Sequence, residues 1–206
     1  MKIRLEEEKD YLEVENLVRD SFWNVYRPGA WEHYIVHNLR DDPSFVKELA
    51  YVIEKDGTII GHINYSYGTI SDDNEKLDGL VLGPISISED CQNQGYGTKL
   101  INYTLKLVED KDIPFIFVIG DENYYQKFGF ESASKYNLFL EGTSHDEECP
   151  FFMVKIFSRN EIDFKDAIFS NPEVFDVDEN DVAEFDKKFE YKQKKVHEGQ
   201  LSEMIK

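Results

Sequence analysis

The chain has 206 residues, of which 41% are hydrophobic and 14% aromatic, and its formal net charge is −19. This composition supplies a folded core and argues against wholesale disorder. The acidic charge argues against nucleic acid as a partner, because phosphate backbones are repelled, and favours cationic small molecules or basic peptides. The charge fits a role in solubility alone equally well. Since no apolar run reaches the length of a bilayer span, we expect no membrane partner.

The N-terminal segment and the cysteines indicate the compartment. Residues 1–8 turn acidic at once and no apolar run follows, which is unlike a secretory signal. Cys91 and Cys149 are too few for a disulfide framework and lack metal-ligand spacing. We therefore expect a cytoplasmic protein without a metal. The oligomeric state is left open between monomer and homodimer.

The first half of the chain changes from helical to strand periodicity near Leu49. Apolar residues alternate at the start and then recur at helical spacing, and later runs alternate again around the hairpin signal Asp56-Gly57. The expected elements are a strand at 2–5, helices at 10–22 and 31–39, and strands at 49–53 and 59–67.

The second half begins with a strand at 80–87, in which Pro84 predicts a bulge or interruption because proline cannot donate to a ladder. Asp121 is a helix cap and Gly129 a helix end. The expected elements are a helix at 96–109, a buried strand at 115–119, a short helix at 121–127, strands at 136–140 and 151–157, a helix from 178 to about 195, and a frayed end from His197.

A glycine loop stands between the strand at 80–87 and the helix at 96–109. Its sequence is Gln92-Asn93-Gln94-Gly95-Tyr96-Gly97. Glycines let the backbone approach a ligand, and the helix behind them offers N–H groups without intrahelical acceptors and a positive dipole end. This arrangement suits a pyrophosphate without net positive charge. The order Gly97-Thr98-Lys99 is wrong for a Walker A loop, and a dinucleotide fingerprint needs a third glycine.

The loop occurs together with a second motif. After the helix and a buried strand comes Tyr125-Gln126-Lys127-Phe128-Gly129-Phe130, and the joint pattern Gln-x-x-Gly-x-Gly with Tyr-x-x-x-Gly-Phe resembles the GNAT superfamily of N-acetyltransferases. The strings at 82–85 and 119–125 look like its bacterial YhbS-type branch.

The resemblance implies an α+β fold. It is a mixed, mostly antiparallel, twisted sheet of about six to seven strands, flanked by helices and splayed at the acetyl-CoA site. It covers residues 1–158, which we expect to form the acetyltransferase domain. Residues 159–206 form an acidic, partly helical extension that packs on that domain by its aromatics.

The resemblance also implies the site residues. Backbone groups of Ile85, Ser86 and Ile87 pair with the pantetheine arm, and an N–H near Ile85 stabilises the oxyanion. Tyr125 protonates the leaving thiolate, with Tyr124 as second choice and a core aromatic as the plain alternative. The residues expected to cradle the pyrophosphate are Gln92, Asn93, Gln94, Gly95, Tyr96, Gly97 and Thr98, with Lys99 as a possible assistant.

The implied function is transfer of an acetyl group from acetyl-CoA to a primary amine of a small molecule or peptide, by direct attack in a ternary complex. One alternative is a non-catalytic acyl-CoA-binding or sensing module, and another is an interaction protein whose acidic extension binds a basic partner. For the general base, Asp78, Glu89 and His62 stay open, although a satisfied core histidine is the simpler interpretation of His62. His33 and His37 have metal-compatible helical spacing but no third ligand.

Overall fold

The computed structural model describes residues 1–73, 75–109, 111–143, 149–157 and 166–200. These residues form two compact units. The first contains residues 1–64, 84–100 and 174–200, and the second contains residues 65–83 and 101–173 apart from the gaps. The long strands β3 (Thr58–Ser71) and β4 (Lys76–Ile87) and the helix α3 (Tyr96–Glu109) contribute residues to both units.

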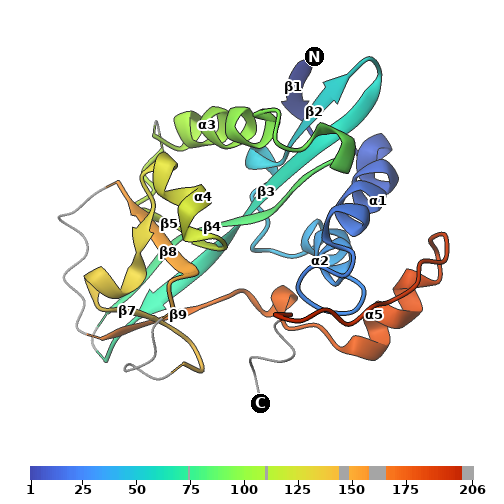
Figure 1. Cartoon of the computed structure of the whole chain (residues 1–206). Coiled ribbons are helices and arrows are strands. Elements are labelled where there is room, and N and C mark those ends of the chain that lie inside the picture. The colour runs from blue at the N-terminus through green and yellow to red at the C-terminus, as the bar shows by residue number, and fades with distance from the viewer. Residues whose placement is uncertain (74, 110, 144–148, 158–165, 201–206) are drawn as a thin grey trace. The chain divides into compact units, whose positions relative to one another are not determined.

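The N-terminal part of the first unit contains the strands at the start of the chain and two helices (Figure 1). The strand β1 (Lys2–Leu5) pairs antiparallel with β2 (Tyr51–Lys55), which pairs antiparallel with β3 through the Asp56-Gly57 hairpin. The helices α1 (Tyr11–Phe22) and α2 (Glu32–Leu39) contact each other on one face of these strands. Their apolar stripe forms a core cluster of Val14, Leu17, Val18, Val36, Val52 and Ile59.

The C-terminal part of the first unit corrects two predictions. The helix α5 (Glu179–Asp186) ends nine residues before the predicted limit at Lys195. Beyond it, the backbone bonds to another segment: Asn24 Nδ2 donates to the Gln193 carbonyl, and Lys195 N–H donates to Asn24 Oδ1. The predicted fraying from His197 is wrong through Gln200, which is 1% exposed and donates to the Asn24 carbonyl. Residues 201–206 lie outside the described residues.

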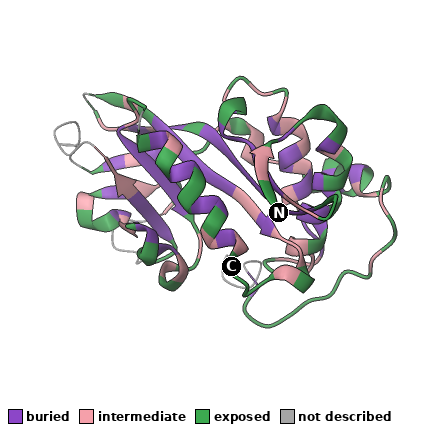
Figure 2. Ribbon diagram, turned by 90° about the horizontal axis from the view of Figure 1, so that it is seen from above, coloured by how far each residue is buried: buried purple, intermediate pink, exposed green. Residues whose placement is uncertain are grey.

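The second unit is built on aromatic packing between strands. Here β5 (Phe115–Ile119) pairs parallel with β4 and antiparallel with β8 (Phe152–Ile156), which also pairs with the two-residue strand β6 (Glu131–Ser132). The strand β9 (Ala167–Ser170) pairs with β7 (Leu138–Leu140) and with β3. Three rings hold the core, with Phe117 centred 5.0 Å from Phe152 and 4.3 Å from Phe169. Figure 2 shows buried residues following the strands.

The pairing of β4 with β5 is short. The two strands pair at Leu80 with Ile116 and at Val81 with Phe117, although β5 continues to Ile119. Gly83, the last residue of β4 in this unit, has a φ of 134°, which favours glycine. The two strands therefore part after Val81. This backbone irregularity directly precedes Pro84, where the sequence predicted an interruption, yet the strand itself continues to Ile87.

The described residues thus form nine strands in a mixed, mostly antiparallel open sheet with flanking helices. The predicted α+β class is confirmed, and the count of six to seven strands was too low because β6 and β9 were missed. The predicted domain boundary at residue 158 falls in the gap at 158–165 and stays a prediction. Within the described residues, none of the helices combines the length and apolar character needed to cross a membrane.

Candidate active site

The glycine loop enters α3 through two residues with left-handed backbone conformation. Asn93 and Gly95 both have positive φ, 59° and 80°, and the first helical hydrogen bond runs from Lys99 N–H to the Gly95 carbonyl at 3.0 Å. The N–H groups at the start of α3 therefore come before the helical ladder begins. No atom of the described residues lies within 4 Å of a side-chain carbon built on Gly95, so the backbone has open space there.

Two glutamine side chains of the loop fold back on the preceding turn. Gln92 Nε2 donates to the Ile87 carbonyl at 3.1 Å, and Gln94 Nε2 donates to the Asp90 carbonyl at 2.9 Å. These bonds direct the two side-chain amides toward the preceding turn. The outer surface of the loop is therefore formed by its main-chain groups. The glutamines are thus structural supports of the loop, a role that the motif alone did not specify.

Two lysines approach the aromatic ring of Tyr96. Lys55 Nζ lies 5.8 Å and Lys99 Nζ 5.3 Å from the ring centre. Hydrogen bonding with Tyr96 is the largest cause that raises the pKa of Lys55, so its ammonium stays charged at neutral pH. These cations offset the acidic character of the chain beside the loop. Lys55 was missed in the sequence analysis, because only the folded hairpin brings it to the ring.

The end of β4 is anchored to its neighbours in the first unit. Ser86 is 3% exposed, whereas Ile85 and Ile87 are half-buried. The Ile87 carbonyl accepts from Ser21 Oγ of α1 at 3.1 Å, in addition to Gln92 Nε2. The structure thus brings the predicted strand residues and the glycine loop together around one carbonyl. The contribution of Ser21 carried no sequence signal.

Tyr125 lies in the second unit, on the short helix α4 (Glu122–Tyr125). Asp121 caps this helix by accepting from Asn123 N–H at 2.9 Å, as predicted. The tyrosine ring is 7% exposed and packs edge-on against Tyr124 and Phe130. A side-chain carbon on Gly120 would lie 2.5 Å from Tyr125 Cε2, so glycine is needed for the ring to sit there. The tyrosine therefore has a fixed orientation within its unit.

The histidines of α2 contact different carboxylates. His33 is fully buried between Phe185 and Phe189, with Nε2 3.4 Å from Asp186, and burial lowers its pKa to about 4. His37 Nδ1 instead lies 2.9 Å from Glu15 Oε1. Helical spacing suggested a shared ligand, but tertiary packing separates their roles. Among the described residues, no group of three or more His, Cys, Asp or Glu side chains is arranged to hold a metal.

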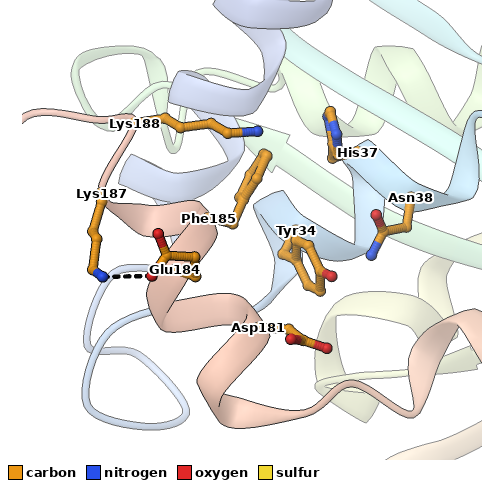
Figure 3. A pocket seen from close by; sticks show the side chains of 8 residues that line it. All are labelled: Tyr34, His37, Asn38, Asp181, Glu184, Phe185, Lys187 and Lys188. Atoms are coloured by element: carbon orange, nitrogen blue, oxygen red, sulfur yellow. Dashed lines mark hydrogen bonds and ion pairs between the residues drawn. The ribbon is translucent and has the colours of Figure 1, made fainter.

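A surface hollow of about 450 Å³ lies between α2 and α5, and Figure 3 shows its lining. Tyr34 and His37 face it from α2, and Phe185 faces it from α5. Of its two lining carboxylates, Asp181 and Glu184, the second is paired with Lys187. We assign no chemistry to this hollow.

The comparisons with known proteins match the region of the loop and Tyr125. Residues 12–130 match the acetyltransferase (GNAT) family. The Escherichia coli K12 protein named "Uncharacterized N-acetyltransferase YhbS" is 27% identical over 138 residues, which are 67% of this chain and 78% of that protein.

Solved structures show the same fold. The Escherichia coli YhbS structure in complex with CoA has a TM-score of 0.72 at 23% identity, over 85% of this chain and 92% of that one. A GNAT acetyltransferase from Brucella melitensis in complex with acetyl-CoA has a TM-score of 0.66 at 24% identity, over 84% and 97%. The fold is that of the N-acetyltransferases. The family match spans more than half of the chain, which therefore belongs to the acetyltransferase (GNAT) family and is an acyltransferase.

Proposed function

We propose that this protein transfers the acetyl group of acetyl-CoA to a primary amine of a small molecule or peptide, by direct attack in a ternary complex. The observation that carries the proposal is the loop at the start of α3, with positive φ at Asn93 and Gly95 and main-chain N–H groups ahead of the helical ladder. Two similar solved structures contain CoA or acetyl-CoA. We place the reaction in the cytoplasm, on the two free cysteines.

The loop residues fit a diphosphate. A helix N-terminus with exposed main-chain N–H groups attracts an anion despite a net charge of −19. Lys55 and Lys99 add positive charge beside Tyr96. The residues proposed to hold the pyrophosphate are Gln92, Asn93, Gln94, Gly95, Tyr96, Gly97 and Thr98, and those proposed to pair with the pantetheine arm are Ile85, Ser86 and Ile87.

Tyr125 is the proposed proton donor to the leaving sulfur. A phenol that donates a proton or hydrogen bond to a thiolate lowers the barrier to its departure. Its aromatic neighbours and Gly120 fix the ring, which supports a defined donor direction. The ring packing equally fits a core role, so the variant Tyr125→Phe decides between them: it removes the hydroxyl and keeps the ring.

The proposed acceptor is a cationic amine, because the acidic chain steers cations toward it. We propose that aromatic residues of α1, of α2 and of the segment between them wall the acceptor pocket, with ordinary packing between the two helices as the alternative; they are Phe22, Trp23, Tyr26, Trp31 and Tyr34. Trp23 and Trp31 already stack with arginines, with Arg19 4.3 Å and Arg27 3.5 Å from the ring centres. We therefore assign these two tryptophans to the framework of the pocket.

The test is thiol release from acetyl-CoA with a panel of amines: spermidine, tyramine, an aminoglycoside and a lysine-containing peptide. We expect amine-dependent thiol release with at least one of them. Tyr125→Phe should lose about a hundredfold in kcat while it retains acetyl-CoA binding. Binding without amine-dependent release in the unaltered protein would instead support a non-catalytic acyl-CoA sensor.

A further inference from the structure

In the described part of the chain, the strands β3 and β4 carry four buried polar side chains without hydrogen-bond partners, of which Ser66 belongs to the second unit and three belong to the first. The atoms in the first unit are both ring nitrogens of His62, both amide atoms of Asn64, and Oγ of Ser86. His62 and Asn64 are fully buried. Buried polar groups in proteins are nearly always paired, because an unpaired one loses its hydration without replacement. The expected burial of His62 is confirmed, whereas the described residues supply no hydrogen bond to its ring.

The three side chains share one face of the strand pair. A side-chain carbon on Gly61 would lie 2.7 Å from Ile87 Cδ1, so Gly61 and Ile87 face the same side. Side chains alternate along a strand, which puts His62 and Ser86 together on the opposite side. Asn64 is two residues from His62 on the same strand and therefore lies on the same side as His62 and Ser86. Ser86 is therefore the residue of the proposed acyl-binding strand that faces His62 across the two strands.

A buried carboxylate stands next to His62. Glu6 Oε1 lies 3.7 Å from His62 Nε2 and 2.7 Å from Arg40 Nη2. The same guanidinium bonds to Glu15 Oε1 at 2.5 Å, and Glu15 in turn bonds to the half-exposed His37. Two carboxylates thus share one arginine, and this shared charge stabilises each of them only in part.

The protonation preferences of this pair are complementary. Burial raises the pKa of Glu6, and burial together with Arg40 lowers the pKa of His62 to about 3. A neutral imidazole accepts a hydrogen bond on one nitrogen and donates from the other. Glu6 takes up a proton more readily than an exposed carboxylate. The charged and titratable groups that face Glu6 are Arg40, Glu15, Asp10, Tyr11 and His62.

We propose that His62 binds the acceptor amine and passes its proton to Glu6, with Ser86 and Asn64 as further hydrogen-bond partners of the acceptor. This inference rests on the proposed acetyl transfer. The nitrogen–carbon bond forms and the carbon–sulfur bond breaks. The cationic amine loses two protons in all: the first passes through His62 to Glu6 before the attack, and the second leaves the new amide nitrogen for solvent, from which Tyr125 is reprotonated. The sulfur gains one proton, from Tyr125. His62 is the catalytic residue of this step, and Glu6 acts through it.

The test compares Glu6→Gln with the matched control Glu15→Gln, since both carboxylates bond to Arg40. Rates are measured with the panel amine that gives the fastest thiol release and with hydroxylamine, which is already neutral near pH 7. Glu6→Gln should lower kcat/KM for the cationic amine about a hundredfold and leave hydroxylamine within about threefold. Glu15→Gln should change both acceptors equally. Loss of both acceptors by the same factor in Glu6→Gln would overturn the inference.

A second readout is independent of turnover. ¹⁵N NMR of the histidine rings in the full chain should show a neutral His62 from pH 8 to pH 5, and shifts of its ring nitrogens on addition of the amine. If the shifts of the His62 ring nitrogens do not change at saturating amine, the ring bonds to buried water and not to the acceptor, and the inference is overturned. The variant His62→Gln retains a polar side chain and should still bind acetyl-CoA. Absence of that binding in the unaltered chain would refute the proposed function itself.

Discussion

Gly95 provides the sharpest mutational prediction. Its φ of 80° lies in the left-handed region, and within the part of the chain that the structure describes no atom lies within 4 Å of an added side-chain carbon. In Gly95→Ala the strain therefore comes from the backbone alone, about 1 kcal/mol. For a domain of this size, that strain lowers Tm by roughly 3 °C. The methyl group also enters the space proposed for the diphosphate, or the loop relaxes and turns its N–H groups away. We expect the Kd for acetyl-CoA to rise at least tenfold, or about 1.4 kcal/mol.

The matched control is Gly57→Ala in the hairpin between β2 and β3. Gly57 has a φ of 86° and equally open surroundings, so the two variants carry the same strain. Thermal unfolding should give similar Tm decreases for both. Equilibrium dialysis with labelled acetyl-CoA should show weakened binding only in Gly95→Ala. Equal affinities in the two variants would refute the assignment of the loop as the anion site.

The remaining predictions concern Tyr125 and a buried histidine. Gly120→Ala forces the Tyr125 ring to move, so kcat should fall about tenfold while acetyl-CoA binding is kept. The control Gly79→Ala overpacks Phe115 in the same unit, because the added carbon would lie 2.0 Å from that ring. The folded fraction of the Gly79→Ala protein should keep the normal kcat. Both variants should lose about 1–3 kcal/mol of stability in urea unfolding, and a kcat loss shared by both would contradict the role of the tyrosine. Folding lowers the pKa of His33 from 6.5 to about 4, so the unfolded state binds more protons between these values, and stability should fall as pH drops through this window. His33→Gln should flatten that part of the stability curve measured by denaturant unfolding, and an unchanged slope would contradict the burial argument.

Local periodicity was sufficient for most of the fold. The predicted helix at 96–109 and strand at 115–119 match α3 and β5 residue for residue, because each combines a clear apolar pattern with glycine or proline at its borders. The pairing of β9 with β3 and β7 had no such signal, since four residues are too few to show a period. The length of α5 was overestimated because backbone bonds to Asn24 replace the helix after Asp186.

The candidate site was predictable where it depends on neighbouring residues and not where it depends on distant ones. The loop from Gln92 to Thr98 and its helix are contiguous, so the loop motif together with the motif at Tyr125 predicted them from the sequence, and the role of the loop as an anion site stays a prediction. The contact of Lys55 with Tyr96, the bond from Ser21 to Ile87, and the Glu6–His62 pair join residues 41 or more positions apart. Such contacts arise from strand register and helix packing, which periodicity does not specify.

Isothermal titration of acetyl-CoA into the full chain tests the central claim most directly. The account predicts saturable heat with one molecule bound per chain, and competition by inorganic pyrophosphate at the loop. If millimolar acetyl-CoA produces no heat of binding at two temperatures, the loop at the start of α3 is not a nucleotide site and the proposed acetyl transfer is wrong.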